Sequence, residues 1–108
     1  MAFSKANLYH EREQRISEFM RLGGHPARLI ILYHLYLEGP CTVEEITAVG
    51  YLRQSTVSRH LATLRDQGMV LYEEVNPYIY YTLDGEMMKK MEEEIMRFFE
   101  RFRSRDQN

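Results

Sequence analysis

The sequence lacks what several classes of protein require. Its 108 residues contain one cysteine, Cys41, which excludes a disulfide within the chain and a cysteine-rich metal cage. The longest apolar run, Leu29–Tyr33, is far shorter than the about 20 apolar residues that span a bilayer. The first residues are charged where a secretory signal would be apolar, so no signal peptide is expected. This length and these absences predict one small cytoplasmic domain.

The chain also has no strongly basic segment. It carries 14 basic and 16 acidic residues, a net charge of −2, and both signs are spread along its length. This balance argues against strong non-specific binding to nucleic acid, although it leaves room for a local DNA-reading surface. The sequence contains no phosphate-binding glycine loop and no pairing of a nucleophile with a base. We therefore expect neither an enzyme nor a bound cofactor.

Two helices are predicted in the first third of the chain. Residues 3–22 place apolar side chains between charged ones, and a glycine pair ends this helix. A second helix is predicted over residues 26–38, with Pro26 at its first position. Apolar side chains cover most of its surface, which predicts a buried central helix. His34 on this helix is accordingly predicted to be a core histidine.

A short helix, a tight turn and a longer helix are predicted over residues 42–67. Thr42 is expected to cap the short helix, since Glu45 follows three residues later as in a capping box. The longer helix, over about 54–67, has apolar residues at the spacing i, i+4, i+7. This stripe consists of Val57, Leu61 and Leu64. The pattern is typical of a helix-turn-helix.

The hydrophobic period then changes from 3.6 to 2. Residues 69–83 predict a β-hairpin, and Asp84 is expected to cap a final helix over residues 85–103. We predict a mainly α fold with a small β-hairpin (α+β), in which residues 1–108 form a single winged helix-turn-helix domain with flanking helices. Residues 42–67 would form the helix-turn-helix and residues 69–83 the wing.

Several segments resemble ArsR/SmtB-type repressors. The matching segments are Thr42–Ile46 and Gln54–Leu61 for the helix-turn-helix, Leu64–Val70 and Tyr80–Leu83 for the wing, and Gly24–Leu32 for the second helix. The resemblance covers about residues 20–84. It implies a homodimer that binds double-stranded operator DNA as a transcriptional repressor, with residues 1–22 and 85–103 as dimerisation helices. Large apolar stripes on both flanking helices agree with that interface, because a small monomer would struggle to bury them.

The candidate DNA-reading residues lie at the start of the longer helix, because recognition helices present their N-terminal residues to base edges. Gln can bond adenine and Arg can bond guanine, while hydroxyl groups suit phosphates. The residues that match the family positions are Gln54, Ser55, Ser58 and Arg59, with Thr56 and His60 in second rank. The alternatives are a solvated polar face for the helix and a packed or wing-contacting role for His60.

The predicted wing departs from the family pattern. Its tip carries Glu73 and Glu74 where the family usually has basic residues and a glycine. Carboxylates facing phosphates would be repulsive, so either the wing is held off the DNA or these glutamates pair with arginines. Asn76 and Tyr78 remain candidate donors to the DNA backbone. A winged-helix protein-interaction module with little DNA binding is the alternative function.

No metal site of the family is recognised in this sequence. Thr42 and Glu44 occupy the positions of a Cys-x-Cys metal pair, and no histidine follows His60 to supply a site on the last helix. We therefore expect no metal. Cys41 is a possible redox residue, because Pro40 and the following helix N-terminus could lower its pKa. The alternative for Cys41 is a small, half-buried loop residue.

Overall fold

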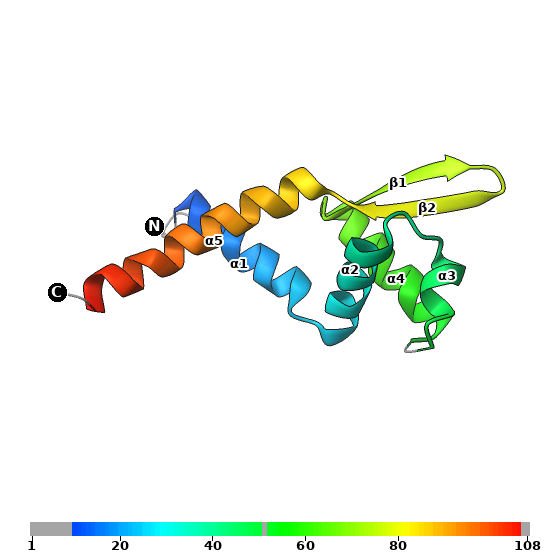
Figure 1. The fold of residues 1–108 in the computed structure, drawn as a ribbon, viewed down its shortest axis with the longest axis horizontal. Coiled ribbons are helices and arrows are strands. Elements are labelled where there is room, and N and C mark those ends of the chain that lie inside the picture. The colour runs from blue at the N-terminus through cyan, green and yellow to red at the C-terminus, as the bar shows by residue number, and fades with distance from the viewer. Residues whose placement is uncertain (1–9, 51, 107–108) are drawn as a thin grey trace, which may run out of the picture.

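The computed structural model describes residues 10–50 and 52–106, with the side chains of residues 104–106 left aside. Along the described chain, consecutive helices are followed by one β-hairpin and then by a last helix, as the sequence predicts (Figure 1). The elements are α1 (Glu11–Gly23), α2 (Pro26–Glu38), α3 (Val43–Thr47), α4 (Gln54–Asp66), β1 (Val70–Val75), β2 (Tyr78–Leu83) and α5 (Gly85–Asp106). The mainly α fold with a winged helix-turn-helix is confirmed. Residues 3–9 of the first predicted helix lie outside the described residues.

The helix boundaries follow from local capping. The Thr42 hydroxyl accepts a hydrogen bond from the Glu45 amide at 3.1 Å, and Pro26 occupies the first turn of α2. The Asp84 carboxylate accepts from the Met87 amide at 3.2 Å and so begins α5. Gly68 follows α4 with a φ of 79°, a left-handed conformation that glycine adopts without strain. These caps satisfy backbone groups that a helix end leaves unpaired.

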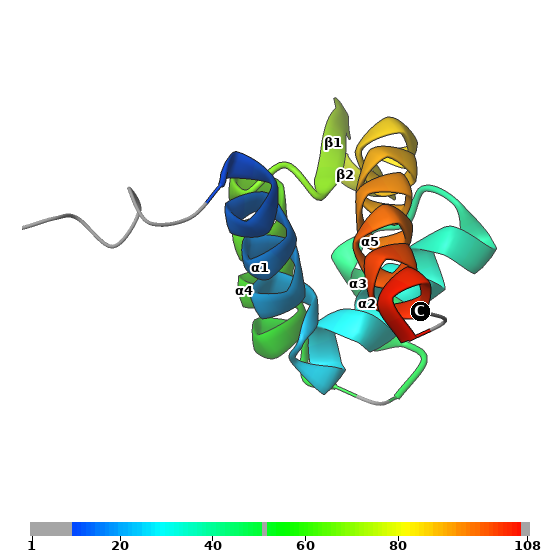
Figure 2. The same cartoon turned by 90° about the vertical axis from the view of Figure 1, so that its left-hand side faces the viewer.

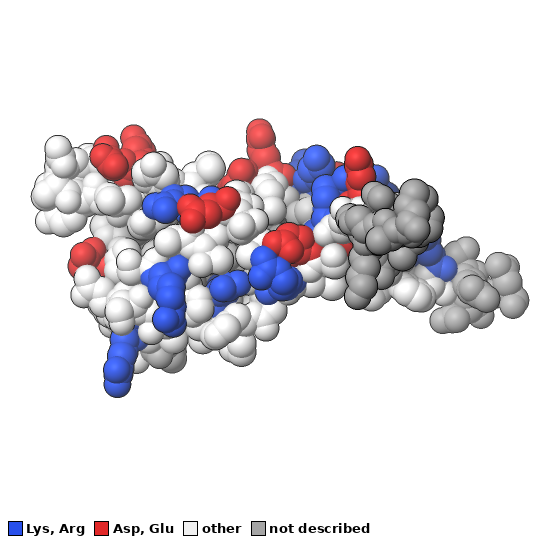
Figure 3. Space-filling model, turned by 180° about the vertical axis from the view of Figure 1, so that it is seen from behind, with Lys and Arg blue, Asp and Glu red and all other residues white. Residues whose placement is uncertain are grey.

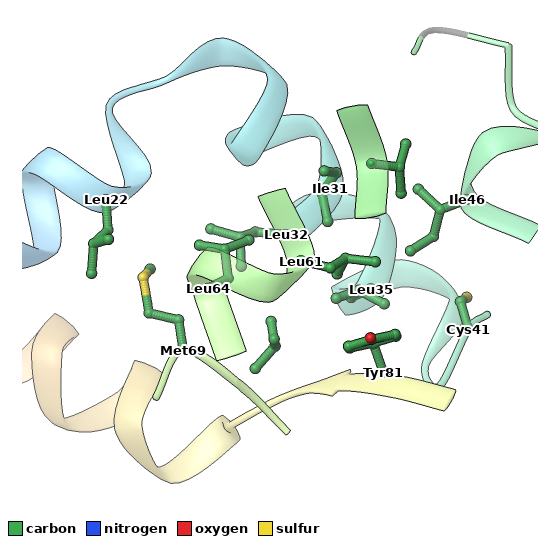
Figure 4. Packing of buried hydrophobic residues seen from close by; sticks show 12 residues of the cluster. Leu22, Ile31, Leu32, Leu35, Cys41, Ile46, Leu61, Leu64, Met69 and Tyr81 are labelled. Atoms are coloured by element: carbon green, nitrogen blue, oxygen red, sulfur yellow. The ribbon is translucent and has the colours of Figure 1, made fainter. Parts of the chain in front are cut away.

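The core lies between α2, α3, α4 and the base of the hairpin (Figure 4). The predicted stripe of α4 is confirmed, since Val57, Leu61 and Leu64 are fully buried. Tyr81 of β2 closes the core from the hairpin side. Because one face of α4 is fixed in the core, its opposite face is held in a defined orientation toward solvent.

The first and last helices pack against each other beside this core. Figures 1 and 2 show α1 and α5 side by side, with α5 extending away from the winged part of the molecule. Arg15 donates to Glu94 from Nη2 to Oε1 at 2.7 Å and from Nε to Oε1 at 3.1 Å. Hydrogen bonding from Arg15 lowers the pKa of Glu94. This charged pair ties α1 to the middle of α5.

The prediction that α2 is buried on all sides is wrong. Only one stripe of α2 is buried, and its opposite side is exposed to solvent. The exposed large side chains are Leu29, Ile30, Tyr33, Tyr36 and Leu37. The reason is that α1, α4 and β2 cover only part of this helix. His34 is correspondingly half-buried beside Ile46 and Leu52, at the edge of the core rather than inside it.

Replacing a core leucine of α4 should destabilise the fold far more than replacing an exposed leucine. Leu61 is 0% exposed and Leu71 is 50% exposed. Leu61→Ala is expected to lower the free energy of unfolding by about 2–5 kcal/mol, because it leaves a cavity. Leu71→Ala should cost less than about 1 kcal/mol. Urea denaturation at one protein concentration measures both, and equal losses would contradict the placement of α4.

Candidate nucleic-acid interface

The exposed face of α4 begins at its first residue. Gln54, Ser55, Ser58 and Arg59 are all exposed, while Thr56 is half-buried. They occupy the first two turns of a 13-residue helix whose other face is in the core. The structure therefore brings the four first-rank candidate residues together on one solvent-facing surface. The free amide groups at this helix start point toward the same end of the surface.

The side chains of these four residues have no hydrogen-bond or ion-pair partner within residues 10–50 and 52–106. Arg65, at the other end of α4, differs: its Nη2 lies 3.2 Å from Asp66 Oδ1, and its guanidinium lies 5.3 Å from the centre of the Tyr72 ring. Donors that are free to bind a ligand therefore gather in the N-terminal half of α4.

Arg53 extends this surface by one residue. It precedes α4 as the N-cap residue, is exposed, and its side chain makes no capping hydrogen bond. Arg53 is not among the DNA-contacting residues predicted from the sequence. The signal that could have found it is a basic residue directly before the predicted recognition helix, where a long side chain can reach a phosphate.

Basic side chains lie near α4 on this side of the molecule, with acidic side chains beside some of them and on the wing (Figure 3). Figure 3 shows Lys and Arg over α4 and its surroundings at the lower left, with Asp and Glu on the wing above. Glu73 and Glu74 are exposed on β1, and no ion pair between described residues involves either of them. The described structure therefore does not show the predicted alternative, in which Glu73 and Glu74 pair with arginines. Asn76 and Tyr78 are exposed at the tip of the hairpin.

His60 points away from the exposed face. It is 6% exposed, and its Nδ1 accepts a hydrogen bond from Arg28 Nε at 3.3 Å. The rings of His60 and His25 have centroids 4.8 Å apart. Burial, followed by the charges of His25, Arg28 and Arg59, lowers the pKa of His60. This position agrees with the packed alternative and removes His60 from direct contact with bases.

Cys41 is buried. This differs from both alternatives for this residue, the half-buried loop residue and the thiol with a lowered pKa. Its backbone pairs with Tyr81 in both directions, at 2.9 and 2.7 Å, and its Sγ donates to the Gly39 carbonyl at 3.3 Å. Burial raises the pKa of the Cys41 thiol, and the charges of Glu45 and Glu38 add to the effect. The predicted lowering of its pKa is wrong, because burial and the nearby carboxylates of Glu45 and Glu38 disfavour the thiolate.

No cluster of three or more His, Cys, Asp or Glu residues suited to a metal ion occurs among the described residues. No helix in the same part of the chain is long and apolar enough to cross a membrane. The exposed start of α4 carries polar side chains on the described surface. Its polar groups, flanked by a hairpin, define the class of winged helix-turn-helix regulators of transcription.

Known proteins resemble this chain in sequence and in fold. The model of the "Bacterial regulatory protein, arsR family" matches residues 25–72. The transcriptional repressor PagR of Bacillus anthracis is 34% identical over 67 residues, 56% of this chain and 68% of PagR. The cadmium resistance transcriptional regulatory protein CadC homolog of Staphylococcus aureus is 27% identical over 90 residues, 83% of this chain and 74% of the homolog. Reduced HlyU from Vibrio cholerae N16961 matches with a TM-score of 0.64 and 30% identity, over 82% of this chain and 94% of HlyU.

The chain belongs to the ArsR family of bacterial regulatory proteins. The resemblance noted in the sequence is thereby confirmed, and so is the expectation that the protein is not an enzyme. It is a DNA-binding regulator of transcription.

Cys41 should react slowly with alkylating reagents while the protein is folded. Iodoacetamide attacks the thiolate, and both burial and a raised pKa disfavour that form. At pH 7.5, we expect alkylation of the native chain to be at least about tenfold slower than that of the chain unfolded in guanidinium. Mass spectrometry of the modified protein over time measures both rates. Equal rates would restore Cys41 as a redox candidate.

Proposed function

We propose that this regulator is a homodimeric, sequence-specific repressor in which the start of α4 reads operator DNA. The observation that carries the proposal is the set of exposed polar side chains on the first two turns of α4, which have no partner among the described residues. The similarity to PagR, a transcriptional repressor, supports repression over activation. A protein that acts on operator DNA would work in the cytoplasm.

Gln54 and Arg59 are the proposed base-reading residues. Glutamine can bond adenine in two places and arginine can do the same with guanine, so both fit the edges of bases in the major groove. Ser55 and Ser58 are short and let the helix approach closely, and their hydroxyls suit phosphate oxygens. Thr56, half-buried beside them, would take a secondary role at the DNA backbone.

The wing would meet DNA only at its tip. Asn76 and Tyr78 are exposed there and carry donors for phosphate oxygens. Glu73 and Glu74 lie further back on β1, and their carboxylates would repel phosphates at close range. The proposed contact therefore keeps the acidic part of the hairpin away from the DNA backbone.

Arg59→Ala should weaken operator binding by about 1–3 kcal/mol, or roughly 5- to 150-fold, because it removes a bidentate contact to a base. Arg97→Ala is the matched control, since it removes the same charge from an exposed position on α5. Fluorescence anisotropy would use a labelled duplex from upstream of the protein's own gene, or one selected from random duplexes, beside a scrambled duplex.

Equal affinities of Arg59→Ala, Arg97→Ala and the unchanged protein would contradict a base-reading role for Arg59. Should the unchanged protein bind no duplex selectively, even after selection, the alternative of a protein-interaction module would replace the proposed function. The acidic, exposed wing would then be the first surface to test for a protein partner.

The proposed homodimer would form through the C-terminal half of α5. Three phenylalanine rings contact one another there, with centroids 5.1–6.3 Å apart. Met96, Phe99 and Phe102 nevertheless remain exposed in the single chain. A contiguous apolar surface on a helix of this length is costly to leave in water. A two-fold pairing of α5, with α1 beside it, would bury this surface in both copies at once.

Phe99→Glu should convert the dimer to a monomer, because a carboxylate in an apolar interface has no partner to offset its loss of hydration. Tyr78→Glu is the matched control: Tyr78 is 54% exposed and Phe99 is 53% exposed, but Tyr78 lies on the wing. Sedimentation equilibrium of the two variants gives their masses. A dimeric Phe99→Glu variant, or a monomeric unchanged protein, would refute this interface.

The protein is further proposed to lack the family's usual metal sites. The sequence places Thr42 and Glu44 where a cysteine pair would stand, and Thr42 is engaged in capping α3. Cadmium resistance is a property of the Staphylococcus aureus relative. Neither a metal nor another cofactor is part of the proposed DNA-reading surface.

A further inference from the structure

A cluster of basic side chains joins the back of the recognition helix to the start of α2. His60 lies on the buried side of α4, directly after Arg59, and accepts its hydrogen bond from Arg28 of α2. His25 caps α2 by accepting from the Ala27 amide at 3.1 Å, and its ring contacts that of His60. Arg28 also donates from Nη1 to the Leu22 carbonyl of α1 at 3.3 Å. One arginine thus links α1, α2 and α4.

This link needs a neutral His60. A neutral imidazole can accept a hydrogen bond at Nδ1, whereas a protonated one carries N–H on both nitrogens and cannot. Adding a proton at Nδ1 would therefore break the hydrogen bond from Arg28. The positively charged groups of His60 and Arg28 would then face each other across the distance that now separates the donor and the acceptor. The contact that now holds α4 to α2 would become a repulsive one.

The surroundings offer nothing to compensate a positive charge on His60. The charged and titratable groups acting on it are His25, which precedes α2, Arg28 from α2 and Arg59 from α4, and no carboxylate is among them in the described residues. Burial also keeps water away from the ring. Histidine usually changes its charge between pH 5 and 8, and the lowered pKa of His60 places its protonation toward the acidic end of that range.

We propose that His25, Arg28 and His60 position α4 for DNA only while His60 is neutral, so that the proton acts as an inhibitor of operator binding. Arg59, a proposed base-reading residue, is the neighbour of His60 in the helix, so a displacement at His60 moves the reading surface directly. This inference rests on the proposed function and assigns a regulation to the same site. In it, His60 is a positioning residue and does not touch DNA.

The direction of the pH effect distinguishes this device from ordinary electrostatics. Protonating exposed histidines adds positive charge to a protein and strengthens its binding to DNA phosphates. The His60 cluster predicts the opposite, a weaker complex at lower pH. We expect the affinity for the operator duplex to fall by about fivefold or more between pH 7.5 and 5.5 at constant ionic strength, a common size for coupling between sites.

The test compares three proteins by fluorescence anisotropy on the same duplex across this pH range. His60→Asn supplies an acceptor near the position of Nδ1 but does not titrate, so its affinity should be nearly independent of pH. His34→Asn is the matched control, because His34 is a half-buried histidine on α2 outside the cluster. It should lose affinity at pH 5.5 as the unchanged protein does.

Affinity that is unchanged or tighter at pH 5.5 in the unchanged protein would overturn the proposal, and so would an equal loss in His60→Asn. If His60→Asn does not fold, the pH midpoint of the affinity loss is compared with the titration of the His60 ring followed by NMR. Coinciding midpoints support the proposal and separated ones refute it.

Failure of the proposed function would show differently, as an absence of selective binding already at pH 7.5. In that case the test is to measure the amide hydrogen-exchange protection factors of α4 at the two pH values. Protection that falls at pH 5.5 in the unchanged protein but not in His60→Asn supports the positioning role of the cluster. Equal protection at both pH values refutes it.

Discussion

Burial of one apolar stripe on α4 is the interaction on which the rest of the structure depends. Val57, Leu61 and Leu64 fill the centre of the core, where α2, α3 and the hairpin base all pack. Because this face is fixed, the opposite face has a single orientation toward solvent. Gln54 and Arg59 on that face are exposed, and their side chains have no partner among the described residues.

Charge is distributed so that a slightly acidic chain can still approach DNA. The net charge of −2 gives little long-range attraction, and the wing is acidic. The basic side chains near α4 therefore act locally, on a surface of a few residues. A regulator of this kind would gain its affinity from fitted contacts more than from counterion release, which suits selection of a particular operator over random DNA.

The sequence predicted the order of the elements and which side of α4 is exposed. The spacing of Leu61 and Leu64 after Val57 fixed which side of α4 is buried, and so which residues are exposed. Capping residues such as Thr42 and Asp84 marked where helices begin. The family resemblance, carried by a short string of residues on α4, was confirmed by comparison with known regulators. These signals are local, because helical period and capping involve residues at most a few positions apart.

The sequence by itself determined the order of the elements, the buried stripe of α4 and the polar composition of its exposed face. Only the tertiary structure decided the states of His60, Cys41 and the outer side of α2. His60 takes its partner from Arg28, 32 residues earlier, and Cys41 is covered through its pairing with Tyr81. The exposure of α2 depends on how few elements pack around it. Burial and pKa are set by neighbours that are distant along the chain, which no local pattern encodes.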